Sequence, residues 1–270
     1  MNGVILDAGS FDQNDLITSS LEASLENWHW HRSTLPNQTM ARIAGMNVIV
    51  TNKVAITASA LESASLQLIV IAATGTNNID LEAAQRKAIS VCNVRNYASP
   101  AVSQHVFSMM LALYTHLSDY ANAVREGRWH QSPVFCLLDY PINELAGKTL
   151  GIIGYGNLGK RVARIAQGFD MNVVIAARPG TTMIPPGRVS FDELIDRSDV
   201  ISLHCPLNDN TNNLIGHREL KRMKSGAILI NTARGGIVNE SALVEALRTG
   251  EIAGAGIDVL TQEPPDNWQP

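Results

Sequence analysis

Short apolar runs alternate with helical patterns along residues 1–98 of the chain. The runs occupy residues 3–6, 46–51 and 66–71, and the helical patterns occupy 58–64 and 80–88. Continuous apolar runs of this length are typical of strands that are buried on both faces of a sheet. Asp80 is suited to be the N-cap of the second helix. Strands that alternate with helices in this way predict a parallel sheet.

A longer helical pattern runs from residue 99 to residue 125. Its apolar side chains recur at spacings of three and four, at Val102, Val106, Met109, Met110, Leu113 and Leu117. This spacing predicts one amphipathic helix, which we expect to bridge two domains. The segment 127–147 that follows has no regular pattern, and it contains Pro133 and Pro141.

A second alternating series begins at residue 148. Its apolar runs predict five strands, at 148–153, 172–176, 200–203, 227–230 and 253–257. Helical patterns lie between them at 158–168, 191–196, 217–223 and 240–249. Five such strands suffice for a doubly wound sheet. The sequence therefore predicts an α/β protein with two doubly wound parallel-sheet domains, residues 1–98 and residues 99–270, the second of which begins with the bridging helix.

The composition narrows the class of partners. The chain has 270 residues, 45% of them hydrophobic, and a formal net charge of −4. A chain without concentrated positive charge is not expected to bind nucleic acid. No apolar run approaches the roughly 20 residues that cross a bilayer, and no basic leader precedes the first strand, so we expect no membrane contact. Three widely spaced cysteines indicate neither disulfides nor a metal site, which favours a cytoplasmic location.

A glycine fingerprint stands directly between the strand at 148–153 and the helix that follows. It reads Gly154-Tyr155-Gly156-Asn157-Leu158-Gly159. In this context Gly154 permits a tight turn, Gly156 lets the backbone approach a pyrophosphate, and Gly159 lets the helix pack closely on the strand. The alternative is a glycine-rich turn without a ligand. Strand, spacing and helix together favour a Rossmann NAD(P)-binding domain, in which Tyr155, Gly156, Asn157 and Leu158 contact the cofactor.

The end of the next strand bears on the choice of cofactor. An acid at this position would bind the adenosine ribose of NAD(H), but the sequence here is Ala176-Ala177-Arg178-Pro179. No carboxylate repels a 2′-phosphate, and the guanidinium of Arg178 can pair with one. These residues favour NADP(H) over NAD(H). The alternative is that Arg178 points into solvent and NAD(H) binds through its pyrophosphate and nicotinamide.

Two further strand ends carry charged residues. Arg234 follows the strand at 227–230, and Asp258 and Glu263 follow the strand at 253–257. The carboxyl ends of parallel strands meet at one edge of a sheet, where ligands bind, so Arg234 is well placed to hold a carboxylate. Taken singly, a charge at such a place is more often a surface residue. The fingerprint beside them favours a functional site.

These segments, taken together, resemble the D-2-hydroxyacid dehydrogenase family. The matching motifs are the fingerprint at 154–159, Cys205-Pro206-Leu207, the N-T-A-R-G-G segment at 231–236 and D-V-x-x-x-E-P-P at 258–265. The loop at 73–80 resembles the family's substrate-carboxylate loop, so the resemblance covers essentially the whole chain. It implies a flavodoxin-like substrate domain before the Rossmann domain. Within the family, this loop and Thr51-Asn52-Lys53 look most like the glycerate dehydrogenases, also called hydroxypyruvate reductases.

The resemblance implies roles for individual residues. Backbone N–H groups of Gly75 and Thr76 would hold the substrate carboxylate, and Arg234 would bind it and polarise the ketone. Glu263 would raise the pKa of a proton-transferring histidine by pairing with it. Asp258 would contact the nicotinamide carboxamide, with helix capping as the alternative. The remaining cofactor contacts implied are Cys205, Pro206, Thr211, Thr232 and Ala233.

The sequence departs from the family pattern at its histidines. The family's histidine follows the glutamate by roughly twenty residues. The seven histidines here are at positions 29, 31, 105, 116, 130, 204 and 217, all before Glu263. We expect His204 to be a packed residue and not a substitute base. A chain that ended at Pro270 would bind cofactor but turn over about 10² to 10⁴ times more slowly.

An uncharged loop at 73–79 suits a small hydroxy acid better than a phosphorylated one. We therefore expect reduction of hydroxypyruvate or glyoxylate to D-glycerate or glycolate, while Lys53 keeps D-3-phosphoglycerate oxidation open. A third interpretation is a non-catalytic NAD(H)-binding corepressor-like module, which resembles the family in fold. The absence of charge-rich extensions favours the enzyme. The resemblance also implies a homodimer, formed through the helix at 102–117 and the segment 127–141.

Overall fold

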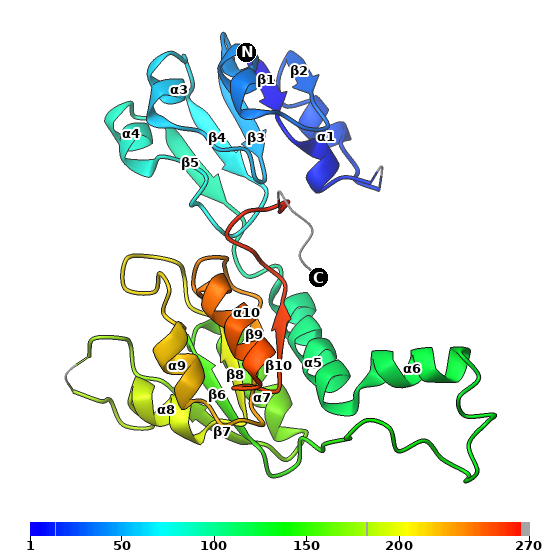
Figure 1. Ribbon diagram of the computed structural model, residues 1–270. Helices are drawn as coiled ribbons and strands as arrows, with labels where there is room; N and C mark the ends of the chain where they lie inside the picture. Colours follow the sequence, from blue (N-terminus) through cyan, green and yellow to red (C-terminus); the bar gives the residue numbers. More distant parts are fainter. Residues whose placement is uncertain (14, 182, 266–270) are drawn as a thin grey trace. The chain divides into compact units, whose positions relative to one another are not determined.

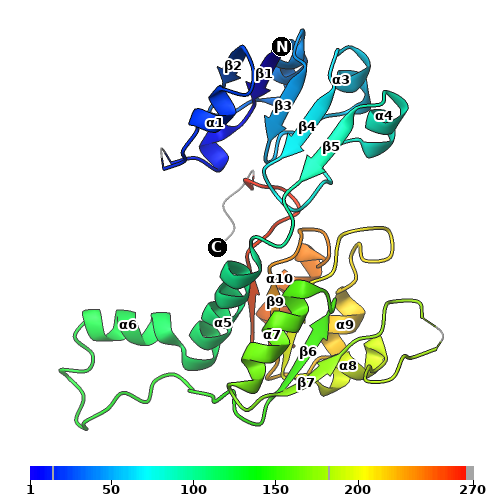
Figure 2. The ribbon, with the colours of Figure 1, turned by 180° about the vertical axis from the view of Figure 1, so that it is seen from behind.

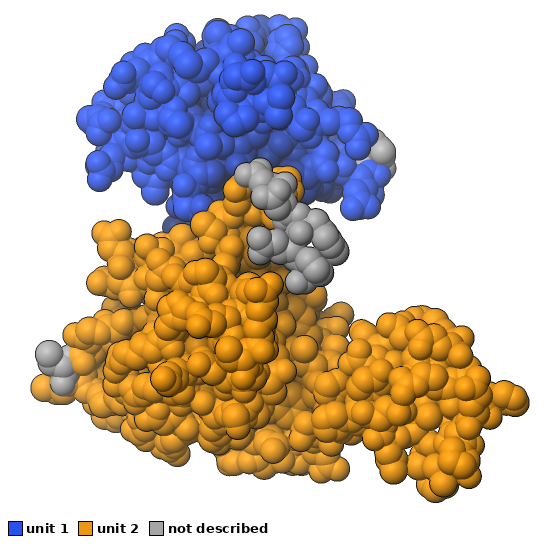
Figure 3. All heavy atoms as spheres, in the orientation of Figure 1, with its two compact units in different colours: residues 1–97 blue, residues 98–270 orange. Residues whose placement is uncertain are grey.

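The computed structural model describes residues 1–13, 15–181 and 183–265. The chain divides into two compact units, Met1–Tyr97 and Ala98–Pro270. Figure 3 colours the two units differently. Each unit contains one sheet of five parallel strands, which confirms the predicted α/β class with two parallel sheets.

Unit 1 has the strand order β2-β1-β3-β4-β5. This order is that of the flavodoxin-like fold. The strands are β1 Asn2–Ile5, β2 Asn27–Trp30, β3 Val48–Thr51, β4 Leu68–Ile71 and β5 Ser90–Asn93. The helices are α1 Ser19–Glu22, α2 Thr39–Ile43, α3 Ala58–Glu62 and α4 Leu81–Arg86, with short 3₁₀ turns at Ala8–Ser10 and Pro36–Gln38.

The three strands predicted in unit 1 form the middle of its sheet, where β3 is buried along its whole length. The apolar side chains of β1, β3 and β4 contribute to its core, with Val4, Ile49 and Ile69 fully buried. The sequence patterns did not reveal β2 and β5. Both are edge strands with partly exposed residues, so they lack a continuous apolar run.

Unit 2 has the strand order β10-β9-β8-β6-β7, again with all strands parallel. Its strands are β6 Thr149–Ile153, β7 Asn172–Ile175, β8 Val200–Leu203, β9 Ile228–Asn231 and β10 Gly254–Ile257. Its later helices are α7 Asn157–Gln167, α8 Phe191–Arg197, α9 His217–Arg222 and α10 Glu240–Thr249. The predicted bounds of these nine elements agree with the observed ones to within one residue at each end.

The long helix predicted from residue 99 is instead two helices, α5 Ser99–Thr115 and α6 Leu117–Arg125. His116 separates them with a left-handed backbone, φ 49°, and its ring is paired with Asp119 at 2.9 Å. Val106, Phe107 and Met110 bury α5 in the core that also contains β6 and α7. Figures 1 and 2 show α6 and the chain after it projecting away from the sheet of unit 2.

No helix within the described ranges is both long and apolar enough to cross a membrane. The fold instead supplies, in unit 2, one sheet edge at which five strands end side by side. Because all five strands are parallel, the loops that leave them lie along the same edge. The predicted cofactor and catalytic residues of unit 2 lie on these loops.

Candidate active site

The glycine turn joins β6 to α7, as the fingerprint predicts. Gly154 has φ +99°, a conformation that side chains rarely adopt, and a Cβ added there would lie 2.5 Å from the backbone N of Cys205. A Cβ at Gly159 would collide with the carbonyl oxygen of Gly154. The protein itself therefore requires glycine at both positions, because the turn packs against β8 and the helix packs against the turn.

Gly156 differs from these two glycines. It is the N-cap of α7 with φ −81°, and a Cβ added there would meet nothing within 4 Å. Neither the backbone conformation nor the surrounding protein excludes a side chain at this exposed position. A ligand bound against the backbone would exclude a side chain there. A helix N-terminus that is open to solvent binds a phosphate through its N–H groups. The residues present therefore fit the pyrophosphate of a dinucleotide.

The loop after β7 carries no acid. Ala176 and Ala177 are buried, and Arg178 is exposed. The side chain of Arg178 forms no ion pair within the described part of the chain. The end of this strand thus offers a cation, and no carboxylate, to the part of a dinucleotide that the fold binds there.

The loop after β8 contains Cys205, Pro206 and Thr211. Burial raises the pKa of the Cys205 thiol to about 11, so this side chain is a neutral, apolar lining group near pH 7. Thr211 is buried, and its hydroxyl donates to the carbonyl of Pro206 at 2.6 Å and accepts from the N–H of Asn208 at 2.8 Å. Thr211 therefore holds the loop in shape. Its direct contact with a cofactor stays a prediction.

His204 precedes this loop at the end of β8. Its Nε2 lies in a hydrogen bond 2.9 Å from Oγ of Ser202, while Nδ1 is buried without a partner among the described residues. Burial lowers the pKa of the imidazole to about 4. The ring is thus neutral near pH 7, which is the behaviour of a packed histidine and not of a general acid.

Asn231, at the end of β9, organises the next loop. The side chain is 1% exposed, its amide donates to the carbonyl of Arg234 at 3.0 Å, and its Oδ1 accepts from the N–H of Ala233 at 3.0 Å. These two bonds set the backbone that carries Thr232 and Arg234. Oγ1 of Thr232 is buried with no protein partner in the described ranges, so it is a polar atom left for a ligand.

Arg234 is half-buried, and one of its guanidinium N–H groups donates to the carbonyl of Ala233. The folded-back guanidinium keeps further N–H donors for a carboxylate. Gly235 beside it lies so close to the Leu260–Thr261 backbone that a Cβ there would collide with the carbonyl of Leu260. The loops after β9 and β10 are therefore packed together, and they bring Arg234 next to the segment that leads to Glu263.

The loop after β10 begins with Asp258. Its N–H donates to the carbonyl of Asn231 at 3.0 Å, which places it on the same sheet edge as Arg234. Its Oδ1 lies 3.2 Å from Nε2 of His105 on α5. Glu263 is exposed, and its carboxylate accepts from the N–H of Leu260 at 3.0 Å. Sequence reasoning did not assign His105 to this site, because its partner comes from a distant part of the chain.

Unit 1 contains the predicted substrate loop. Gly75 and Thr76 lie between β4 and α4, both half-buried. Asn78 in the same loop donates to the carbonyl of Val54 at 3.1 Å, which ties it to the loop after β3. Asn93 on β5 donates to the carbonyl of Thr74 at 2.7 Å. The loop that presents Gly75 and Thr76 is therefore held by side-chain amides on both sides.

Asp7 is a residue of this unit that sequence reasoning missed. It is 6% exposed, and its carboxylate accepts from the hydroxyl of Thr51 at 3.0 Å and from the N–H groups of Asn52 at 2.9 Å and Lys53 at 2.7 Å. These bonds fix the Thr51–Lys53 segment. The available signal was an acid directly after a buried strand, which indicates a polar partner nearby.

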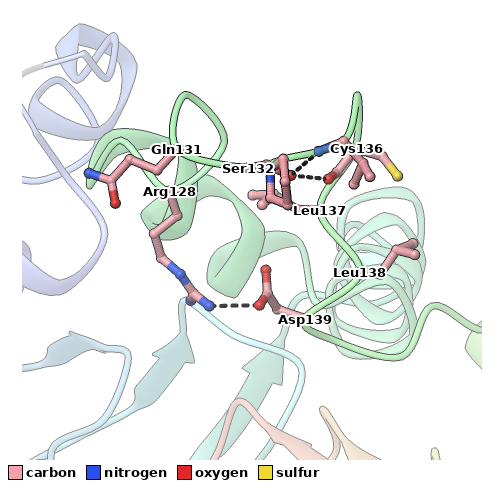
Figure 4. A pocket seen from close by; sticks show the side chains of 9 residues that line it. Arg128, Gln131, Ser132, Cys136, Leu137, Leu138 and Asp139 are labelled. Atoms are coloured by element: carbon pink, nitrogen blue, oxygen red, sulfur yellow. Dashed lines mark hydrogen bonds and ion pairs between the residues drawn. The ribbon is translucent and has the colours of Figure 1, made fainter.

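Two hollows on the surface of the described residues lie away from these side chains. One of about 410 Å³ is lined by the segment that follows α6, from Arg128 to Asp139. Figure 4 shows Arg128 paired with Asp139, at 2.8 Å, on its wall. None of the predicted site residues lines this hollow, so it does not mark the candidate active site.

The fold and the residues at the strand ends together define the class of protein: an α/β protein with a dinucleotide-binding turn and an arginine at the same sheet edge. A family model described as "D-isomer specific 2-hydroxyacid dehydrogenase, NAD binding domain" matches residues 107–270. The chain therefore belongs to the D-isomer-specific 2-hydroxyacid dehydrogenase family.

Known relatives agree with this membership. A glycerate dehydrogenase of Methylorubrum extorquens is 47% identical over 232 residues, which cover 85% of this chain and 72% of that protein. A hydroxypyruvate reductase of Blautia hydrogenotrophica is 34% identical over 270 residues, 98% of this chain and 84% of that one. Among solved structures, an acyclic imino acid reductase in complex with NADPH and D-Arg has a TM-score of 0.85 at 27% identity, covering 99% and 85% of the two chains.

Proposed function

We propose that this protein transfers a hydride between a nicotinamide dinucleotide and a small 2-keto or 2-hydroxy acid. One observation carries the proposal: Asn231 fixes the Arg234 loop on the sheet edge where the glycine turn opens α7. An anion-binding helix start and a substrate-binding guanidinium thereby share one edge. Family membership and the names of the relatives support the same reaction.

The dinucleotide supplies or accepts the hydride when it is bound. The N–H groups at the start of α7 bind the pyrophosphate, and Thr232, Ala233 and Asp258 orient the nicotinamide half. Arg234 binds the substrate carboxylate and stabilises the negative charge that grows on the C2 oxygen during reduction. Within unit 1, we assign the binding of a carboxylate to the backbone N–H groups of Gly75 and Thr76, as the family resemblance implies. Glu263 is the carboxylate partner of the proton-transferring histidine that family resemblance implies.

We propose hydroxypyruvate and glyoxylate as the substrates. The uncharged 73–79 loop and the relatives named glycerate dehydrogenase and hydroxypyruvate reductase support this choice. Steady-state rates with hydroxypyruvate, glyoxylate and 3-phosphohydroxypyruvate test it. We expect kcat/KM for one of the first two to exceed that for the phosphorylated acid at least tenfold. The opposite order would make D-3-phosphoglycerate the substrate, and cofactor binding without turnover of any acid would favour a corepressor-like module.

We propose NADP(H) as the preferred cofactor, because Arg178 offers a cation and the end of β7 offers no carboxylate. Michaelis constants for NADPH and NADH, measured with the same acid, test this preference. We expect the lower constant for NADPH. A preference for NADH above tenfold would overturn the assignment.

We also propose a homodimer formed through unit 2. The segment after α6 exposes large apolar side chains, among them Phe135 at 90% and Leu138 at 83%. Apolar side chains exposed in one continuous segment indicate a surface that is covered by a partner. Sedimentation velocity measures the oligomeric state. We expect wild type to be a dimer and the double variant Phe135→Asp/Leu138→Asp to be a monomer. A wild-type monomer at micromolar concentration would exclude it.

A further inference from the structure

Arg188 lies at the end of β7, although it belongs to the segment that precedes α8. Its Nη1 donates to the carbonyl of Ala176 at 2.8 Å. Its guanidinium carbon lies 5.6 Å from the centre of the Tyr155 ring, within cation–π range. The side chain is thus held between the strand end and the second residue of the glycine turn.

The backbone beside Arg188 is fixed as well. Val189 forms a parallel bridge with Ala176, in which its N–H donates to Ile175 at 2.9 Å and its carbonyl accepts from the N–H of Ala177 at 2.8 Å. This short extension of the sheet gives Arg188 a defined position. A guanidinium that is oriented in advance loses less side-chain entropy when it binds a ligand.

The charge of Arg188 is not neutralised within the described ranges of the chain. The nearby acids on α8 have other partners, because Asp192 pairs with Arg218 and Arg222, and Glu193 pairs with Arg197. Arg188 is half-buried, and only one of its contacts is a hydrogen bond. The guanidinium therefore retains donors for an anion, and its planar geometry suits a phosphate.

We infer that Arg188 is a specificity-determining residue that binds the 2′-phosphate of NADP(H) together with Arg178. The inference deepens the proposed cofactor preference and rests on it. The second strand of such a fold, here β7, ends where the adenosine ribose is recognised. Arg178 follows the end of β7 closely, and Arg188 is hydrogen-bonded to Ala176 at that end. The carbonyl of Ala176 and the ring of Tyr155 hold Arg188 there, while exposed Arg178 supplies the second charge.

Calorimetric titration with two matched ligands tests this role. Adenosine 2′,5′-bisphosphate and adenosine 5′-monophosphate differ only in the 2′-phosphate. We expect Arg188→Gln to weaken the bisphosphate roughly 10- to 100-fold, the effect of losing a charge-assisted hydrogen bond, and to change the monophosphate less than threefold. Arg188→Lys keeps the charge without the planar fork, so its affinity for the bisphosphate should lie between those of wild type and Arg188→Gln.

Arg164→Gln is the matched control, because it removes one exposed positive charge from α7 without touching the end of β7. It should leave the ratio of the two affinities unchanged. If Arg188→Gln weakens both ligands equally and lowers the melting temperature, Arg188 only ties the loop to the sheet and the inference is wrong. If wild-type protein binds both ligands equally, the proposed NADP(H) preference fails first, whereas dinucleotide binding itself still stands.

Discussion

Nε2 of His105 lies 3.2 Å from Oδ1 of Asp258, and this contact joins α5 to the loop after β10. Both side chains are about half exposed, 48% for His105 and 46% for Asp258. The backbone N–H of Asp258 donates to the carbonyl of Asn231, which positions the backbone. The contact with His105 then orients the carboxylate. A helix that begins unit 2 thereby orients the residue we assign to the nicotinamide carboxamide.

Removing His105 should weaken the nicotinamide half of the cofactor selectively. We expect His105→Ala to raise the dissociation constant of the reduced dinucleotide about two- to fivefold, because a partly exposed charged pair contributes only a small free energy. ADP-ribose lacks nicotinamide, and its affinity should stay the same. His217→Ala, which breaks an exposed pair with Glu245 on α10, is the control. Equal losses for both ligands would show that His105 acts on the whole fold and not on Asp258.

The glycines of the turn should respond differently to alanine. Gly156→Ala adds a methyl group in open space at a permitted φ, so the free energy of unfolding should stay within about 1 kcal/mol of wild type. The dissociation constant for the dinucleotide should nevertheless rise at least tenfold. Gly154→Ala places a Cβ against backbone at φ +99° and should destabilise by about 2–4 kcal/mol. Urea denaturation and fluorescence titration give the two quantities.

Arg234 should act on the acid and not on the cofactor. We expect Arg234→Gln to lower kcat/KM for hydroxypyruvate about 10²- to 10³-fold, as loss of a charged donor to a developing oxyanion does. The dissociation constant of the cofactor should change less than threefold. Arg234→Lys should recover only part of the lost kcat/KM, because a lysine cannot form two parallel hydrogen bonds with a carboxylate. Arg248→Gln, at the end of α10, is the control; an unchanged kcat/KM in Arg234→Gln would remove Arg234 from the site.

Asp7 should stabilise unit 1. Asp7→Ala leaves the N–H groups of Asn52 and Lys53 and the hydroxyl of Thr51 without their acceptor. We expect a loss of roughly 2–4 kcal/mol in the free energy of unfolding, since the buried hydroxyl of Thr51 and two part-buried N–H groups lose their acceptor and a buried donor without a partner costs about 1–3 kcal/mol. Glu62→Ala, in an exposed position at the end of α3, is the comparison. A loss below about 0.5 kcal/mol for Asp7→Ala would contradict the role.

His204 should make stability depend on pH. Burial lowers its pKa from 6.5 to about 4 in the folded protein, so between these values the unfolded chain binds a proton that the folded chain does not. Stability therefore falls as the pH drops from about 6.5 to 4 and is constant, for this group, above that window. The shift corresponds to roughly 3 kcal/mol. Urea denaturation of wild type and His204→Gln at several pH values isolates this contribution. The difference between their free energies of unfolding should shrink toward acid pH, and a difference that does not change with pH would contradict the lowered pKa.

The sequence predicted unit 2 closely because its local patterns were strong. The runs that became β6, β8 and β9 are fully or almost fully buried, so apolar residues dominate them. The fingerprint then located the turn before α7. The patterns were weaker in unit 1, where the edge strands β2 and β5 carry polar residues. In unit 2 the patterns did not indicate the left-handed His116 that divides α5 from α6.

By itself, the sequence determined the five strands of unit 2, the helices between them and the three central strands of unit 1. It also determined that the loops with Arg234, Asp258 and the glycine turn leave parallel strands at one edge. These features follow from local periodicity and from glycine and strand chemistry, which neighbouring residues set. Only the tertiary structure decided the pairs that join distant segments: His105 with Asp258, Arg188 with Ala176, and Asp7 with the Asn52–Lys53 backbone. Such pairs depend on strand order and on how helices cover the sheet, which no periodicity along the chain encodes.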